Sequence, residues 1–461
     1  MMLSRRLGLA CAVAVALIGA IVTTGAATPV SAADPLGGGG EYHPLTPQRI
    51  FDSRPVPASL NDVAPLGAKP MSPATPSFNL RILGLGGVPA SPDQVLGVVV
   101  NITVIDPAAS GYLTAYGKGA AAGTSSIINF LAGQTVSNLA IVRPGLDGEL
   151  SVGLNASSGT AQVVVDVFGW FSTSTVAAGG EGARLIPTSP GRILDTRGAV
   201  NRTPAGTPLA PRESIRLPIR GVDAVNPTVI DVVPDSSSVV GVVLNLTGIS
   251  RGQTFLSVLP EDLPPGTDPS TSNVNLAANS VKANLVIVPV GADGRIRIFN
   301  YGGSTDVIAD VVGYLQVSGD PASRAGRVVP LATPYRTFDT RDPQWGGVTL
   351  GPGQAEDWSF AAFANSVAIG GVWVGNQLGV IGNLTNASLA RQYPTVPVSS
   401  YLTAWPLGAP RPGSSNLNSV EGSAVPNLAV LTYGNPNTVS IYNAAGYAHY
   451  LFDASAVILA N

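Results

Sequence analysis

An eight-residue pattern occurs three times along this chain at nearly equal spacing. It reads PQRIFDSR at 47–54, PGRILDTR at 190–197 and PYRTFDTR at 334–341. The central Asp residues, Asp52, Asp195 and Asp339, are 143 and 144 positions apart. Because this spacing matches the typical length of a single domain, the pattern predicts three homologous folding units.

Further short blocks follow in the same order in every copy. The corresponding positions are Asn101, Asn245 and Asn383; Tyr112, Phe255 and Tyr401; Asn129, Asn275 and Asn418; Asn138, Asn284 and Asn427; and Asp166, Asp310 and Asp453. Small-residue stretches at 173–182 and 317–325 are typical of linkers. The predicted repeat domains are 41–172, 183–316 and 326–461.

Within a copy, the apolar residues form short β-branched runs bounded by Gly, Pro or Asn. Examples are VVGVVLNL at 239–246 and VIADVV at 307–312. About eight such runs per copy, several apolar on both faces, favour two packed sheets. Asp147-Gly148 and Asp293-Gly294 predict hairpin turns. The predicted fold class is therefore all-β, with three tandem homologous β-sandwich (jelly-roll-like) domains after a signal peptide.

The N-terminus has the pattern of a secretory signal peptide over residues 1–32. Arg5-Arg6 precede an apolar run at 7–22, and small residues surround Ala32. The run is shorter than the ~20 residues that span a bilayer, so we expect cleavage and no membrane span afterwards; a retained anchor is the alternative. Residues 33–40, which end in four glycines, predict a flexible lead-in. We expect a secreted protein, extracellular or associated with the cell wall.

Composition excludes several functional classes. The chain has 25 basic and 28 acidic residues and a net charge of −3, unlike a nucleic-acid-binding protein. Two His, one Cys and no repeated Ser-His-Asp set predict no metal, no cofactor and no catalytic site. An enzyme of unrecognised class is the remaining alternative. Because the single Cys lies in the signal peptide, each domain has to be stable on its own hydrophobic core.

The scarce charges concentrate in the repeated Arg-x-x-Asp-[Ser/Thr]-Arg block. In an extended segment its Asp and second Arg share a face, and its first Arg points to the other. The Asp in the apolar run that ends each copy needs a partner, because an unpaired buried carboxylate costs several kcal/mol. We predict that Asp166 meets Arg49 or Arg54, Asp310 meets Arg192 or Arg197, and Asp453 meets Arg336 or Arg341. The predicted structural ion-pair residues are Arg49, Asp52, Arg54, Asp166, Arg192, Asp195, Arg197, Asp310, Arg336, Asp339, Arg341 and Asp453. In the alternative interpretation, the cluster binds an anionic wall polymer or a metal.

Asn101, Asn245 and Asn383 each begin an Asn-x-Thr sequon. Their position in β runs favours hydrogen bonds to backbone groups over glycosylation, with sugar contact as a third interpretation. The third copy holds most of the tryptophans. The glycan-binding candidates are Trp345, Trp358, Trp373, Trp405 and Tyr401, since exposed rings stack on sugar faces; the alternative is that they fill the core of that copy.

The Pro-x-Arg-x-[Leu/Phe]-Asp-[Ser/Thr]-Arg opening and the Asp-Val-x-Gly-[Trp/Tyr] closing resemble a repeat domain of secreted actinobacterial cell-surface proteins. That domain occurs in tandem or joined to cell-wall hydrolases. The resemblance covers nearly all of the chain after the predicted signal peptide. It implies association with the cell surface or wall, and no catalytic residues carry over.

Two functions fit these observations. The first is a secreted, non-catalytic β-repeat protein that binds the cell wall or extracellular glycans, with a wall polymer or polysaccharide as partner. The alternative is a structural or adhesive surface-layer or appendage subunit, which self-assembles with like subunits through strand edges or apolar patches.

Overall fold

The structure is a computed structural model, and it describes most of the chain from residue 38 onward. The described residues are 38–54, 70–123, 125–177, 182–198, 200–201, 206–260, 267–366, 368–369, 372–373, 376–390 and 398–461. The predicted signal peptide, 1–32, and residues 33–37 of the predicted lead-in lie outside them. No helix among the described residues is long and apolar enough to cross a membrane.

Repeat 1 contributes two four-stranded antiparallel sheets. One has the order β1-β8-β3-β6 and the other β2-β7-β4-β5. The strands are β1 (Tyr42–Asp52), β2 (Ser77–Arg81), β3 (Val95–Ile105), β4 (Gly111–Gly117), β5 (Ile128–Phe130), β6 (Val136–Val142), β7 (Glu149–Ala156) and β8 (Gln162–Ser172), followed by the short helix α1 (Ser174–Ala177). The structure is therefore all-β here, with the chain crossing between two small sheets.

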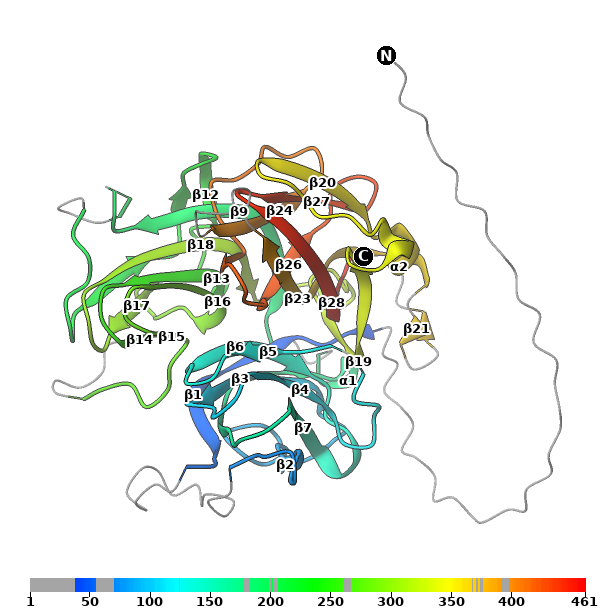
Figure 1. The fold of residues 1–461 in the computed structure, drawn as a ribbon. Coiled ribbons are helices and arrows are strands. Elements are labelled where there is room, and N and C mark those ends of the chain that lie inside the picture. Colours follow the sequence, from blue (N-terminus) through cyan, green and yellow to red (C-terminus); the bar gives the residue numbers. More distant parts are fainter. Residues whose placement is uncertain are drawn as a thin grey trace, which may run out of the picture. The chain divides into compact units, whose positions relative to one another are not determined.

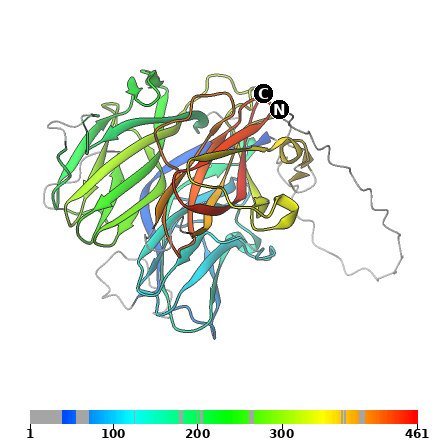
Figure 2. The same cartoon turned by 45° about the horizontal axis from the view of Figure 1, so that its top comes forward.

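Repeats 2 and 3 have the same strand order. Their sheets run β16-β13-β18-β9 and β10-β17-β14-β15, then β19-β28-β23-β26 and β20-β27-β24-β25. Repeat 2 consists of β9 (Arg184–Asp195), β10 (Ser214–Pro218), β11 (Val222–Ala224), β12 (Val229–Val233), β13 (Val239–Ser250), β14 (Thr254–Leu259), β15 (Val274–Leu276), β16 (Ser280–Pro289), β17 (Arg295–Asn300) and β18 (Thr305–Gln316). Repeat 3 consists of β19 (Val328–Asp339), β20 (Gln354–Ser359), α2 (Ala361–Ser366), β21 (Ala368–Ile369), β22 (Val372–Trp373), β23 (Gln377–Ala390), β24 (Ser399–Pro406), β25 (Leu417–Val420), β26 (Val425–Thr432), β27 (Thr438–Asn443) and β28 (Tyr447–Leu459). In Figure 1 the three repeats appear in blue to teal, green, and yellow to red, and Figure 2 shows the same strands turned by 45°.

The central strands are buried on both faces for two different reasons. In β3, Val98, Val100 and Ile102 belong to a hydrophobic cluster built from both sheets of repeat 1. Val99, on the opposite face, belongs to a second cluster that includes residues of all three repeats. The described residues accordingly belong to one compact unit. Repeats 1 and 2 each have a hydrophobic cluster of their own. The expectation that a repeat depends on such a cluster alone was wrong, because residues of all three repeats share a further cluster.

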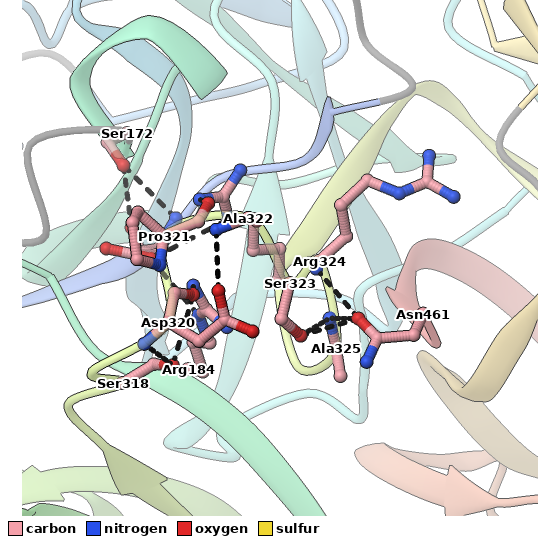
Figure 3. Close-up of polar contacts among 12 residues, drawn as sticks. Ser172, Arg184, Ser318, Asp320, Pro321, Ala322, Ser323, Arg324, Ala325 and Asn461 are labelled. Carbon is pink, nitrogen blue, oxygen red and sulfur yellow. Dashed lines mark hydrogen bonds and ion pairs between the residues drawn. The ribbon is translucent and has the colours of Figure 1, made fainter.

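The predicted flexible lead-in and the second predicted linker both form hydrogen bonds with other parts of the protein. Gly40, in the predicted lead-in, exchanges two backbone hydrogen bonds of 2.9 Å with Val328. A Cβ at Gly40 would lie 1.8 Å from the Ser172 carbonyl oxygen, so glycine is required for this close approach. In the second predicted linker, Ser323 Oγ donates to Asn461 Oδ1 at 2.5 Å (Figure 3). These contacts attach the end of the lead-in and the second linker to the repeats.

The predicted hairpins were also wrong. Asp147 and Gly148 do lie in a tight turn, Leu146–Gly148. However, β6 before the turn and β7 after it belong to different sheets. Asp293-Gly294 likewise connects β16 to β17 across two sheets. The turn chemistry was identified, but local sequence does not specify which strand the chain pairs with afterwards.

Candidate functional site

The charged residues of the repeated block form one network in each repeat. In repeat 1, Arg49 Nε donates to Asp166 Oδ1 at 3.0 Å, and its Nη1 lies 3.5 Å from Asp52 Oδ2. Arg54 binds the same Asp52 at 2.9 and 2.6 Å. Four charged side chains are therefore linked as Arg54–Asp52–Arg49–Asp166.

The networks of repeats 2 and 3 have the same connectivity. Asp310 and Asp453 pair with the first arginine of the block, Arg192 and Arg336, at 2.9 and 2.8 Å. The second arginines bind the Asp within the block, with Arg197 Nη2 2.7 Å from Asp195 and Arg341 Nη2 2.6 Å from Asp339. The first arginines also contact those Asp residues at 3.2 and 2.8 Å. Of the two pairings left open by sequence, the structure contains the one with the first arginine.

The prediction that the first arginine and the Asp of a block point to opposite faces of the strand was wrong, because the strand contains a β-bulge. Strict alternation places Arg49 and Asp52 on opposite faces. The register of β1 against β8 shifts between Arg49 and Phe51, and the same shift occurs between Arg336 and Phe338. One extra residue reverses the alternation, so both arginines of a block reach the same acid.

Burial and charge act in opposite directions on the acids of the network. Burial raises the pKa of Asp166 to about 6, against the opposing charge and hydrogen bonds of Arg49. It also raises the pKa of Asp310 and Asp453. Burial acts the same way on Asp52, but there the hydrogen bonds and charge of Arg54 outweigh it and hold the pKa below its ordinary value. Within each network the pKa is therefore raised at the acid of the terminal strand and lowered at the acid of the repeated block.

Six asparagines connect the three repeats, and we call them the asparagine ring: Asn101, Asn138, Asn245, Asn284, Asn383 and Asn427. Asn138 Nδ2 donates to Asn383 Oδ1 at 3.0 Å, which joins repeat 1 to repeat 3. Asn284 donates to Asn101 at 3.2 Å, joining repeat 2 to repeat 1. Asn427 donates to Asn245 at 2.8 Å, joining repeat 3 to repeat 2 and closing the cycle.

Backbone groups complete the asparagine ring. The Leu139, Leu285 and Leu428 N–H groups donate to Asn284, Asn427 and Asn138 at 3.2, 3.1 and 3.2 Å, always across a repeat boundary. The three sequon asparagines, Asn101, Asn245 and Asn383, donate to the Ser272, Ser415 and Ser126 carbonyls, again in the neighbouring repeat. Sequence predicted hydrogen bonding to backbone, but not that the partner belongs to another repeat. All six side chains are buried, so sugar cannot attach to the sequons in this fold.

A second polar cluster, which sequence reasoning missed, joins the starts of the repeats. Glu41, Arg184 and Arg327 come from repeats 1, 2 and 3 and are only 2%, 3% and 5% exposed. Glu41 Oε1 lies 3.2 Å from Arg184 Nε and 3.6 Å from Arg327 Nε. Figure 3 shows Arg184 donating to the Asp320 carbonyl, at 2.6 Å. The sequence pattern that could have revealed this cluster is a charged residue at the start of every copy, either directly before the first strand or as its first residue, with the charge in repeat 1 opposite in sign to the other two.

A pocket of about 210 Å³ opens at the junction, by which we mean the region where β6, β16 and β26 contact one another. Three pairs of equivalent residues line it, each pair directly preceding an asparagine of the ring: Val136 and Ser137, Lys282 and Ala283, Val425 and Pro426. The remaining polar lining includes Tyr112, Asn129, Gln134, Asn275 and Asn284. None of the described lining residues is acidic.

The predicted aromatic candidates divide into exposed and packed rings. Trp345 and Tyr401 are exposed. Trp358 stacks on Phe338 at 4.3 Å and donates to the Tyr450 hydroxyl, and Trp405 is buried. Trp373 lies in β22, and its side chain is outside the described part of the structure. Trp358 and Trp405 are therefore packing residues, while Trp345 and Tyr401 have rings available to solvent.

Comparisons with known proteins find structural similarity at low sequence identity. No family model matches the chain, and no curated protein matches it. One similar solved structure is described as the triple jelly roll fold and turret assembly in an archaeal virus, at 11% identity, 90% coverage of both chains and a TM-score of 0.16. Another is the tandem CBM22-1-CBM22-2 domain from Paenibacillus barcinonensis Xyn10C, at 11% identity, covering 48% of this chain and 79% of that one, with a TM-score of 0.15. A third is the Sulfolobus turreted icosahedral virus structure, at 9% identity, 82% and 83% coverage and a TM-score of 0.15.

Proposed function

We propose that this chain is a secreted, non-catalytic β-repeat protein that binds glycans of the cell wall or of extracellular polysaccharides. The observation that carries the proposal is the pocket at the junction. Its lining combines apolar side chains with two aromatic rings, amides and hydroxyls, which is the mixture that recognises a sugar ring and its hydroxyl groups. The pocket is smaller than the ~300–1,000 Å³ of a drug-sized site, so it suits one sugar residue of a longer polymer.

The proposal includes a view of the fold. We interpret the six four-stranded sheets as three jelly-roll-like sandwich domains, rather than as six separate blades. The strand order of the first repeat, 1-8-3-6 and 2-7-4-5, supports this, since it is that of two interleaved Greek keys. A hydrophobic cluster that includes both Val152 of β7 and Val165 of β8 also supports it, because those strands belong to the two different sheets.

The test is co-sedimentation of residues 33–461 with purified peptidoglycan and with insoluble polysaccharides. We expect Tyr112→Ala to weaken binding about tenfold, since Tyr112 is the partly exposed one of the two lining aromatic residues and Phe130 is buried. The matched control is Tyr401→Ala, at the equivalent position of repeat 3, which does not line the pocket. Loss of binding in Tyr401→Ala alone would move the site to the exposed rings of repeat 3.

The alternative function, a self-assembling surface subunit, predicts a different result. Self-assembly through strand edges would increase with protein concentration in the absence of any polymer. Analytical ultracentrifugation of the same chain separates the two functions. Concentration-dependent assembly without polymer binding would contradict glycan binding and support the alternative.

A further inference from the structure

Lys282 breaks the threefold repetition of the pocket. It occupies the position two residues before Asn284, and the equivalent positions before Asn138 and Asn427 hold Val136 and Val425. All three residues line the pocket. A lysine therefore replaces a valine at one of three otherwise apolar positions. The chain contains only three lysines, at positions 69, 118 and 282.

The surroundings of Lys282 do not neutralise its charge. It is partly buried on β16, opposite Gly248 of β13. No described residue forms an ion pair or hydrogen bond with its amine. Burial lowers its pKa, with no opposing acid. Lys118 contrasts with it, since that amine lies 2.9 Å from Asp147 and 2.8 Å from Glu149. A partly buried lysine with no neighbouring carboxylate is stabilised by an anion that a ligand brings to it.

Neighbouring polar groups in the pocket supply further hydrogen bonds. Gln134 Oε1 accepts from the Leu131 N–H at 3.1 Å, and no described residue accepts from its Nε2. Asn275 Nδ2 is held by Ser137 and Ser272 at 3.2 and 3.0 Å, which fixes the orientation of its amide at the pocket wall. The free donors, the Lys282 amine and the Gln134 amide, favour an oxyanion over a neutral or cationic group.

We propose that the junction pocket binds an acidic sugar, with its carboxylate or phosphate group held by Lys282 and Gln134. This inference rests on the proposed glycan binding and specifies which class of glycan. Both oxyanions accept hydrogen bonds from an ammonium group, so the shared chemistry is a negatively charged sugar residue of a polymer. Its ring lies against the apolar and aromatic lining, and its charge offsets the burial of the lysine.

The experiment titrates residues 33–461 with glucuronate, with glucose 6-phosphate and with glucose, and ligand-observed NMR measures the binding of each sugar. We expect at least one acidic sugar to bind about tenfold more tightly than glucose, because a charge-assisted hydrogen bond is stronger than a neutral one. The difference in affinity between glucuronate and glucose 6-phosphate shows whether the pocket prefers a carboxylate or a phosphate group. Lys282→Met should reduce the affinity for the acidic sugar to that for glucose. Lys282→Val, which installs the residue of the other two repeats, should do the same.

Lys118→Met is the matched control and should leave all three affinities unchanged. Equal binding of the three sugars, or unchanged binding in both Lys282 variants, would overturn the inference while leaving glycan binding intact. Polymer binding that persists in Tyr112→Ala, with no sugar bound at the pocket, would also overturn it. Failure to bind any sugar or any insoluble polymer would overturn the proposed function itself. Melting curves of each variant establish that it is folded.

Discussion

The interior of a repeat and the junction between repeats bury polar groups in different ways. Inside a repeat, the acid Asp310 is held by Arg192, whose far end also donates to the Gly413 carbonyl of the next repeat, at 3.0 Å. At the junction, neutral asparagine amides donate and accept in a closed cycle. An amide carries both a donor and an acceptor, so a ring of amides can be satisfied without any buried net charge. The comparison indicates that the ion pairs of the repeated block brace each repeat, whereas the amides, together with the Glu41–Arg184–Arg327 cluster, align the repeats.

The largest effect should come from breaking an ion pair inside a repeat. Arg192→Met leaves the carboxylate of Asp310, whose side chain is 1% exposed, without its partner. Removal of one member of a buried pair costs about 3–5 kcal/mol of unfolding free energy. Chemical denaturation monitored by tryptophan fluorescence measures the loss.

The control for this variant is Arg197→Met in the same block. The Arg197 side chain is 48% exposed, and its pair with Asp195 should contribute about 1 kcal/mol or less. Equal losses in the two variants would contradict the distinction between a buried brace and a surface pair.

A smaller loss is expected at the junction. Asn284→Ala removes hydrogen bonds to Asn101, Asn273 and the Leu139 N–H, two of which cross a repeat boundary. Each buried partner left unsatisfied costs about 1–3 kcal/mol. Asn418→Ala is the control, because among the described residues that partly exposed side chain donates only to Ser415, in its own repeat. If Asn418→Ala destabilised the protein as much as Asn284→Ala, the asparagine ring would not be what aligns the repeats.

The smallest effect is a pH dependence that distinguishes the two acids of one network. The folded pKa of Asp166 is about 6, above the ~3.9 of an unfolded carboxyl, so the folded state binds more protons between these values. The Asp166 contribution to stability therefore falls as pH rises from about 4 to 6, and then stays constant. Asp52, with its pKa lowered, acts in the opposite sense: it contributes stability above the unfolded pKa and loses it in acid.

Asp166→Asn isolates this dependence. The difference in unfolding free energy between wild type and variant should decrease across pH 4 to 6. A difference that increases over that interval would mean that Arg49 outweighs burial at Asp166. Urea denaturation at a series of pH values provides the measurement.

The sequence predicted the all-β class and which residues pair within a repeat, since scarce charges that recur in register have few other partners. It did not predict the bulge after Arg49, because a one-residue insertion in a ladder leaves no clear local pattern. Nor did it predict the junction. Asn101 and Asn284 were visible as repeated residues, but their partners depend on how three repeats pack, which no single repeat encodes.

Lys282 and Glu41 were missed for a related reason. A search for residues that all three copies share does not identify a residue that occurs in one copy only. Lys282 stands where the other repeats have valine, and Glu41 is the single acid among two arginines. In a chain built from three repeats, a binding site that is present once is best sought at positions where one repeat differs from the other two.

The central claim is that the three repeats form one folding unit joined by the asparagine ring and a shared hydrophobic cluster. Differential scanning calorimetry of residues 33–461 tests it most directly. The account predicts a single transition whose calorimetric and van't Hoff enthalpies agree. Three separable transitions, each with the enthalpy expected for about 130 residues, would contradict it.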